Sequence, residues 1–294
     1  MIPNLETLLI LDTQYSGAFK TGLGRATDDW QMIATQIPSQ TNINTYAWLG
    51  TFPRMREWIG PRIVRGLDGK SYVLENKDWE LTLGVPRKSI EDDQFGIYLP
   101  FAEQMGMEVK QHKTELVFGA LPKGVTEKGY DGVPFFSANH PVGEGTKSNL
   151  IAGAGPAWYI LDDTQALKSL IFQLRREPEL VAKNRTDDDN MFWDKEAIWG
   201  VDGRYAVGYA FWQTILRSKA TLTEDNLSAA RRQMRELTDD QGRRLNIRPK
   251  LLLVPPELET TAEKLITSAV IANGESNVMQ NKFRLHVSDF LDGT

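Results

Sequence analysis

The sequence has the length and composition of an ordinary globular protein. Its 294 residues are 41% hydrophobic and 25% charged, enough apolar material for one large or two smaller cores. The formal net charge is −5, so the whole molecule is weakly repelled by phosphate polymers, which argues against a duplex-binding protein. Cysteine is absent, which excludes a disulfide framework, thiolate zinc sites and cysteine nucleophiles.

The longest apolar run, LETLLIL at residues 5–11, is too short to span a bilayer. It also lacks the basic region and the cleavage site of a secretion signal. We therefore expect folding in a reducing cytoplasm and no membrane partner.

The first forty or so residues show no sustained period. One short amphipathic run is followed by Gly-rich and Asn/Thr-rich stretches, which predict an extended arm with a helical piece. The stretch TYAWLGTFPRMREWIGPRIV at residues 45–64 follows, and it is rich in aromatic residues and arginine.

Residues 61–91 carry the signals of a long two-stranded hairpin. Asp68-Gly69 is a strong two-residue turn signal. After it, Trp79, Leu81, Leu83 and Val85 alternate with polar residues and glycine at the period of a strand. A two-stranded ribbon has little core of its own, so we expect something outside it to cover its apolar face.

A long helix is predicted for about residues 94–121. Apolar residues recur every fourth position from Ile97 to Val109, and Pro100 fits only within the first turn. The carboxylates of residues 91–93 lie upstream, where they suit the positive end of a helix dipole.

The rest of the chain predicts strands and then helices. Residues 157–217 are rich in β-forming aromatic and aliphatic residues. Thr223 is placed to cap a helix, KLLLVPP is a short buried strand, and ELETTAEKLITSAVIAN is an amphipathic helix. The predicted fold class is α+β, with no internal repeat of solenoid period.

No motif indicates catalytic, cofactor-binding or metal-binding residues, so we expect no enzyme, no cofactor and no metal. His112, His140 and His286 lack a second ligand at a metal-site spacing, and His140 in NHP is interpreted as a turn residue. The acidic run 187–190 is interpreted as a solvated loop. No serine lies in G-x-S-x-G, and the glycine-rich segments fit neither a phosphate loop nor a dinucleotide fingerprint.

An extended arm and an uncovered hairpin favour contacts between copies of the same chain. Tryptophan and arginine are enriched in the cores of such interfaces. The basic residues of the hairpin are expected to meet an acidic surface such as residues 91–93 of a neighbour. Trp48 and Trp58 retain an alternative interpretation as core residues. The predicted contact residues are Trp48, Trp58, Arg62, Arg65, Lys70, Tyr72, Lys77 and Trp79.

Several stretches together resemble the major head subunit of Mu-like phages and prophages, a family of Hong Kong 97-type major capsid proteins. They are TYAWLGTFPRMREWIG, YVLENKDWELTLGV, SIEDDQFGIYLPFAEQMG, YDGVPFFSANHPV, GVDGRYAVGYAFWQ and LLLVPPELETTAEKLI. These stretches are spread over about residues 25–290, and they are specific as a set.

The resemblance implies an N-terminal arm (1–60), an E-loop hairpin (61–91), a P domain (92–220) that contains the long spine helix, and an A domain (221–294). It also implies a structural subunit of the virion that is assembled in the cytoplasm of a host bacterium. Such subunits self-assemble into hexamers and pentamers of an icosahedral shell. The shell encloses double-stranded DNA without sequence-specific binding, and the family implies portal, scaffold and protease partners.

Two other classes remain open at this point. An encapsulin-like bacterial compartment shell would share the fold and hold a protein cargo in place of DNA. A hydrolase would need a deep pocket that holds a carboxyl group with a raised pKa.

Overall fold

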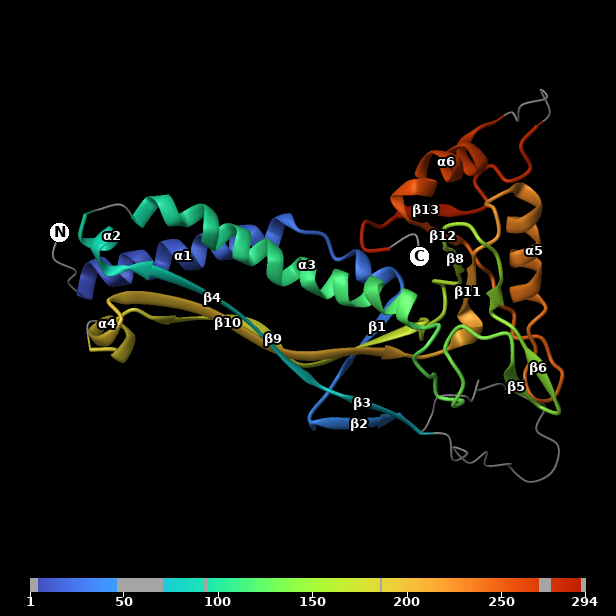
Figure 1. Ribbon diagram of the computed structural model, residues 1–294, viewed down its shortest axis with the longest axis horizontal. Helices are drawn as coiled ribbons and strands as arrows, with labels where there is room; N and C mark the ends of the chain where they lie inside the picture. Colours follow the sequence, from blue (N-terminus) through green and yellow to red (C-terminus); the bar gives the residue numbers. More distant parts are fainter. Residues whose placement is uncertain (1–4, 47–70, 93–94, 186, 270–275, 292–294) are drawn as a thin grey trace.

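The computed structural model describes residues 5–46, 71–92, 95–185, 187–269 and 276–291. Figure 1 shows an elongated body beside a more compact one. The elongated body contains two long helices and a four-stranded sheet, and the compact body surrounds a five-stranded sheet. The mixed composition confirms the predicted α+β class.

The two long helices, α1 (Leu5–Arg25) and α3 (Leu99–Lys123), run in the same direction and pack against each other. Their backbones approach closely because both helices carry glycine at the contact. A Cβ atom on Gly22 would lie 1.9 Å from the backbone oxygen of Glu103, and one on Gly106 would lie 2.1 Å from a backbone oxygen of α1. Only residues without a side chain permit such an approach.

The predicted helical piece of the arm is confirmed, but it is much longer than the short amphipathic run and occupies residues 5–25 as α1, so the extended interpretation is wrong there. The helix buries Leu11 and Tyr15 against the sheet, and the Tyr15 ring stacks on Trp199 with centroids 4.3 Å apart. Full burial of one such side chain contributes roughly 1.5–3 kcal/mol. The length of the helix was not predicted, because glycine at position 22 is typical of a loop, whereas here it lies at the contact between α1 and α3.

The sheet of the elongated body has the strand order β1-β9-β10-β4. Strands β9 and β10 form a long antiparallel hairpin, with the short helix α4 (Asp189–Trp193) at its tip. Strand β1 pairs with β9 in parallel, and β4 pairs with β10 in antiparallel fashion. The strands are β1 (Ala34–Pro38), β4 (Lys77–Pro86), β9 (Leu170–Lys183) and β10 (Glu196–Tyr209).

The first strand of the predicted hairpin lies among residues 47–70, outside the described residues. The alternation predicted for residues 79–85 is confirmed in β4. Its ladder partner is β10, more than a hundred residues later in the chain. Val85 is fully buried, and Leu81 and Leu83 are half-buried against residues of α1, α3 and the sheet. The apolar face of this strand is therefore covered by its own chain. The sequence did not predict this, because local periodicity does not reveal pairing between distant segments.

A separate two-stranded ribbon projects from the end of this sheet (Figure 1). It consists of β2 (Ile43–Tyr46) and β3 (Tyr72–Glu75), paired in antiparallel register. Residues 47–70, which include the predicted turn and first hairpin strand, lie outside the described residues. The observed ribbon begins at residue 43, whereas the predicted hairpin began at residue 61.

The long helix begins later than predicted and extends two residues further. Residues 87–91 form the short helix α2 (Arg87–Glu91), and the 3-10 turn η2 (Phe95–Tyr98) leads into α3. Glu91 pairs with Arg87 inside α2, and the first turn of α3 holds no acidic residue. The predicted role of these carboxylates at the helix entry is therefore wrong for the described residues, whereas Pro100 lies in the first turn as predicted.

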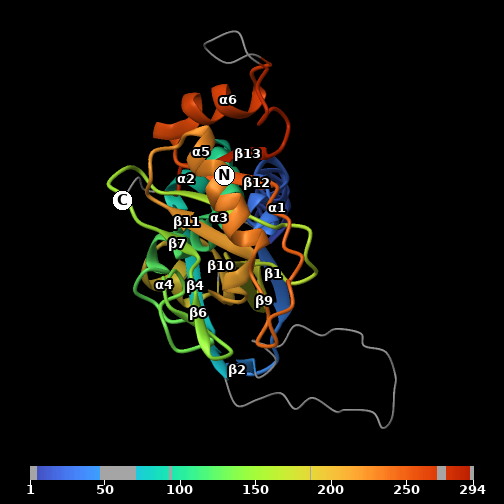
Figure 2. The ribbon, with the colours of Figure 1, turned by 90° about the vertical axis from the view of Figure 1, so that its right-hand side faces the viewer.

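The compact body has a sheet of strand order β13-β12-β8-β11-β7. The expected cap is confirmed, since the Thr223 hydroxyl oxygen accepts a hydrogen bond from the Asn226 backbone nitrogen at the start of α5 (Glu224–Arg235). Figure 2 shows α5 and α6 (Glu259–Thr267) on the side of this body that faces the reader. The strands are β7 (Leu150–Ile151), β8 (Trp158–Leu161), β11 (Ile215–Ser218), β12 (Leu251–Val254) and β13 (Arg284–Val287).

The predicted boundary between residues 220 and 221 divides this five-stranded sheet, since β7, β8 and β11 precede it and β12 and β13 follow it. A boundary at that position separates elements that share one core. The remaining elements are η1 (Asp29–Met32), β5 (His140–Val142), β6 (Gly145–Lys147), η3 (Trp212–Thr214) and η4 (Pro256–Leu258).

Candidate intersubunit surfaces

Three of the eight predicted contact residues lie within the described part of the chain. They are Tyr72, Lys77 and Trp79. The other five, Trp48, Trp58, Arg62, Arg65 and Lys70, lie outside the described residues.

Tyr72 faces its own chain. It lies on the inner face of the β2–β3 ribbon, where its hydroxyl oxygen accepts a hydrogen bond from the backbone nitrogen of Tyr209 at 3.1 Å. On the same face, the hydroxyl of Tyr46 donates to the side-chain oxygen of Gln173 at 2.7 Å. Burial raises the pKa of Tyr72, and the hydrogen bond from Tyr209 opposes that shift. These contacts attach the ribbon to the long sheet.

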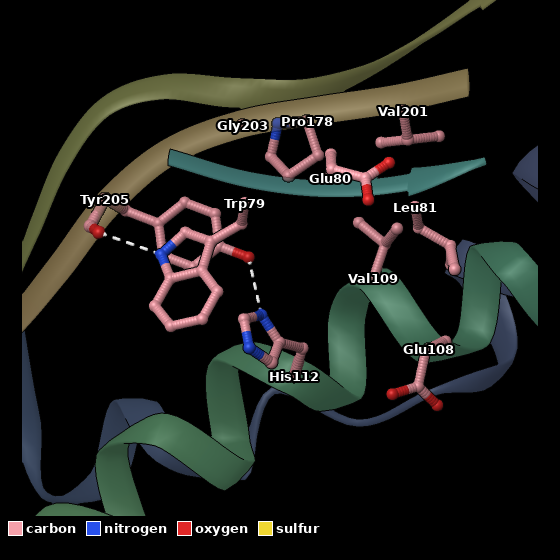
Figure 3. A pocket seen from close by; sticks show the side chains of 10 residues that line it. All are labelled: Trp79, Glu80, Leu81, Glu108, Val109, His112, Pro178, Val201, Gly203 and Tyr205. Carbon is pink, nitrogen blue, oxygen red and sulfur yellow. Dashed lines mark hydrogen bonds between the residues drawn. The ribbon is translucent and has the colours of Figure 1, made fainter. Parts of the chain in front are cut away.

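Trp79 lines a cleft of about 150 Å³ between α3 and the sheet (Figure 3). Its indole nitrogen donates to the backbone oxygen of Tyr205 at 3.1 Å, and its ring meets the His112 ring edge-on at 4.5 Å. The Nδ1 atom of His112 lies 2.8 Å from the Tyr205 hydroxyl oxygen. Burial lowers the pKa of His112, against the opposing charges of Glu115 and Glu108. Trp79 therefore makes a hydrogen bond and ring contacts within its own chain.

Lys77 is exposed at the start of β4 and pairs in the ladder with Tyr205. The acidic group expected to receive such cations is only partly described, because residue 93 lies outside the described ranges. A contact of Tyr72, Lys77 or Trp79 with a neighbouring copy stays a prediction.

The outer face of the ribbon is exposed and partly apolar. In the register of β2 and β3, Ile43 and Thr45 share this face with Val73 and Glu75. Ile43 and Val73 leave about half of their surface in solvent, at 49% and 55%. This face was not singled out from the sequence, because its short strands follow no long alternating pattern.

Helix α4 and the beginnings of α1 and α3 lie at the far end of the elongated body from α5 (Figure 1), and several apolar side chains of these segments are exposed. The most exposed side chains are Phe192 and Trp193 of α4, at 68% and 74%, whose rings meet edge-on at 4.8 Å. One buried cluster underneath joins residues of α1, α2, α3 and α4. We call these exposed residues the distal apolar patch: Leu9, Ile10, Ile97, Phe101, Phe192 and Trp193.

The structure gives His140 a place in the core, and the turn interpretation is wrong. His140 is fully buried at the start of β5 and stacks on Trp212 with ring centroids 3.9 Å apart. Its Nδ1 lies 2.6 Å from a carboxylate oxygen of Asp131, and its Nε2 lies 3.0 Å from the side-chain oxygen of Asn149. The amide of Asn149 also donates to the backbone oxygen of Phe135 at 2.9 Å. The group therefore fastens loops of the compact body to one another.

The described residues contain neither a cluster of metal-ligand side chains nor a membrane-spanning helix. Within the described ranges, no group of three or more histidine, cysteine or acidic side chains is arranged to hold a metal ion. None of the helices in that part of the chain is both long and apolar enough to cross a bilayer.

The sequence matches a known protein family over nearly its whole length. The family model described as "Mu-like prophage major head subunit gpT" matches residues 8–291.

The chain belongs to this Mu-like major head subunit family.

Relatives of known name agree with the assignment. The chain is 39% identical over 305 residues to the major capsid protein of Escherichia phage Mu, which covers 99% of this chain and 100% of that protein. It is 37% identical over 290 residues to the Mu-like prophage FluMu major head subunit of Haemophilus influenzae, with 93% and 94% of the two chains covered.

The fold of this head subunit matches those of solved phage capsid structures. A chain of the bacteriophage JBD30 procapsid matches with a TM-score of 0.88 at 37% identity, covering 98% of this chain and 100% of that one. A chain of the JBD30 capsid matches with a TM-score of 0.78 at 29% identity, with 91% and 92% covered. The fold is therefore the Hong Kong 97-type major capsid fold, and the chain is a major capsid protein of a Mu-like phage or prophage, a component of the virion that associates with copies of itself.

Proposed function

We propose that this head subunit assembles into hexamers and pentamers of an icosahedral shell, and that the shell encloses double-stranded DNA without sequence-specific contacts. The observation that carries the proposal is the match over nearly the whole chain to a procapsid subunit. The net charge of −5 fits a wall around DNA that does not bind the duplex over its whole surface.

The contacts between copies use the distal apolar patch and the outer face of the β2–β3 ribbon. Both surfaces expose large apolar side chains that the chain itself leaves uncovered. Burial of such area contributes about 25 cal/mol per Å². Exposed ion pairs add only about 0–1 kcal/mol each, so apolar area supplies most of the binding free energy. Lys77 and the exposed edge of Trp79 contribute at the margin of the ribbon.

We keep the predicted E-loop, P domain and A domain with new limits, and we assign α1 of the predicted arm to the P domain, because it packs on α3. Among the described residues, the E-loop corresponds to the ribbon of β2 and β3. The P domain comprises α1, α3 and the four-stranded sheet, with α3 as the spine helix. The A domain is the compact body around the five-stranded sheet, to which β7, β8 and β11 belong.

Assembly in the cytoplasm of the host bacterium, together with portal, scaffold and protease proteins, completes the proposal. We assign no catalytic role to the chain. The encapsulin-like alternative is the weaker one, because the family and the relatives of known name are phage and prophage head subunits. Particle contents separate the two: a phage head holds nuclease-protected DNA when the other phage proteins are present, whereas a compartment shell holds protein.

Electron microscopy of the purified full-length chain tests the proposal. Negative staining and light scattering over a range of protein concentrations should reveal rings of five or six subunits and closed shells. A chain that stays a dispersed monomer at high concentration, and also fails to form shells when made together with the other head proteins, contradicts it.

A further inference from the structure

An acidic protein carries a strongly basic groove along α5 in the compact body. The groove has a volume of about 410 Å³, which lies within the range of small-ligand sites. Five of its lining residues are cationic and one, Glu236, is acidic, which gives a local formal charge of +4 against −5 for the whole chain. The cationic residues are Arg231, Arg232, Arg235, Arg244 and Lys282.

The sequence of α5 directs its arginines to one side. Leu227, Ala230 and Met234 are buried in the core of the compact body. Arg232 and Arg235 are exposed on the opposite side, three residues apart and thus neighbours on the helix surface. The periodicity of the helix therefore concentrates positive charge along a single face.

Arg231 is held in place before any ligand arrives. Its guanidinium carbon lies 5.5 Å from the centre of the Phe283 ring, a cation–π contact that fixes the side chain. Its Nε atom is buried and has no hydrogen-bond partner among the described residues. Burial lowers the pKa of Arg231, and the nearby charge of Arg235 lowers it further. Because Arg231 also lines the groove, its guanidinium group is held in a fixed position beside the space that an oxyanion would occupy.

The positive charge in the groove is poorly compensated by its own chain. Arg231, Arg232, Arg235 and Lys282 form no ion pair within 4.0 Å with any described carboxylate. A second hollow on the side of Lys147 shares Arg232 and Glu236, so the basic surface continues past the helix. Such a concentration of one sign of charge attracts counter-ions.

We propose that this basic groove binds phosphate groups, with the guanidinium groups of Arg231, Arg232 and Arg235 as hydrogen-bond donors. Guanidinium forks match phosphate oxygens in pairs. A phosphate group concentrates more negative charge than a carboxylate does, so fewer groups neutralise a charge of +4. The site goes beyond the proposed shell function, since the distal apolar patch and the ribbon lie on other elements.

Two sources share this chemistry, a free polyphosphate and the backbone of a nucleic acid. Calorimetry with tripolyphosphate and fluorescence anisotropy with a short labelled DNA duplex, both at low salt and with the full-length chain, separate them. We expect saturable binding of tripolyphosphate. Duplex binding that responds to the same substitutions assigns the site to nucleic acid, and tripolyphosphate binding alone assigns it to free polyphosphate.

The test variant is Arg232→Gln with Arg235→Gln, because both side chains are exposed and their loss leaves the core intact. It should weaken tripolyphosphate binding by about tenfold or more, as expected for lost charge-assisted hydrogen bonds. The control variant, Arg175→Gln with Arg185→Gln, removes the same charge from exposed positions of the elongated body and should retain the parent affinity. Arg231→Lys keeps the charge, removes the fork and should weaken binding several-fold.

Three results would overturn the proposal. The first is an absence of saturable binding at millimolar tripolyphosphate. The second is an equal loss of affinity in test and control variants, which would indicate only the overall charge. The third is a test variant that binds tripolyphosphate normally and fails to form shells, which would assign the groove to an acidic surface of a neighbouring copy.

Discussion

Two glycines determine how closely the long helices approach. Gly22 of α1 and Gly106 of α3 face the partner backbone at distances that leave no room for a methyl group. Ion pairs along the same contact, Arg25 with Glu103 and Lys110 with Asp28, add little because they are partly exposed. The free energy of this contact therefore comes from packing.

Gly106→Ala should destabilise the subunit. The new methyl group would force α1 and α3 apart, and overpacking of this kind costs about 1–3 kcal/mol. The measurement is urea-induced unfolding of the dispersed chain. Gly119→Ala, in the same helix with no atom within 4 Å of the new methyl group, is the control and should stabilise by roughly 0.5–1 kcal/mol. Equal effects of the two substitutions would refute the packing argument.

His140→Leu should also lower the free energy of unfolding. Leucine would still offer an apolar side chain to the Trp212 ring. It would leave the buried Asp131 carboxylate without the hydrogen bond of 2.6 Å to His140 Nδ1. Leaving a buried polar group without its hydrogen-bond partner costs roughly 1–3 kcal/mol, and more when the group is charged. The same unfolding measurement applies. A loss below 0.5 kcal/mol, on the order of a neutral surface change, would exclude the fastening role.

Single elements were predictable where one chain segment alone decides the structure. The long helix and the strand at residues 79–85 follow from local periodicity, and the helix start at Thr223 follows from its cap. The pairing of β4 with β10 and the packing of α1 on α3 were missed. Both depend on residues far apart in sequence, and the Gly-rich end of α1 resembles a loop until its partner helix is known.

The exposed surfaces of α4 and the ribbon were also beyond sequence analysis. An apolar residue is recognised as uncovered only when the packing around it is known, as for Phe192 and Trp193 beside the buried Met191. The intrachain hydrogen bonds of Trp79 and Tyr72 were likewise not visible in the sequence, and their contact with a neighbouring copy stays a prediction.

Phe192→Ser combined with Trp193→Ser should impair assembly and leave the subunit folded. Both side chains are mostly in solvent, so the free energy of unfolding should change by no more than about 0.5 kcal/mol. Shell yield, measured by sedimentation and negative staining, should fall sharply. Met191→Ala in the same helix is the control, and it should cost about 2–5 kcal/mol of folding free energy because Met191 is buried. Normal shell yield from the double variant would remove the distal apolar patch from the proposed interface.

The whole molecule should lose stability in mild acid. Burial lowers the pKa of both His112 and His286 in the folded chain. Well above the ordinary histidine pKa of about 6.5, both rings are neutral in the folded and unfolded states, so they contribute no pH dependence there. As the pH falls below about 6.5, the unfolded chain takes up protons that the folded chain resists, and stability falls.

Thermal unfolding of the dispersed chain between pH 7.5 and 5 checks this expectation, over a range set by the ordinary pKa of histidine of about 6.5. The melting temperature should decrease on acidification, and His112→Gln with His286→Gln should flatten the dependence. A melting temperature that rises or stays constant in that range would contradict the assignment of both rings as buried and neutral.

We propose that this subunit builds a closed shell through apolar surfaces that its own chain leaves exposed. A cryo-electron microscopy reconstruction of the assembled particle tests it most directly. We predict a Hong Kong 97-type lattice in which neighbouring copies cover Phe192, Trp193 and the Ile43–Val73 face of the ribbon. A lattice that leaves these side chains in solvent, or particles without pentamers and hexamers, would contradict the account.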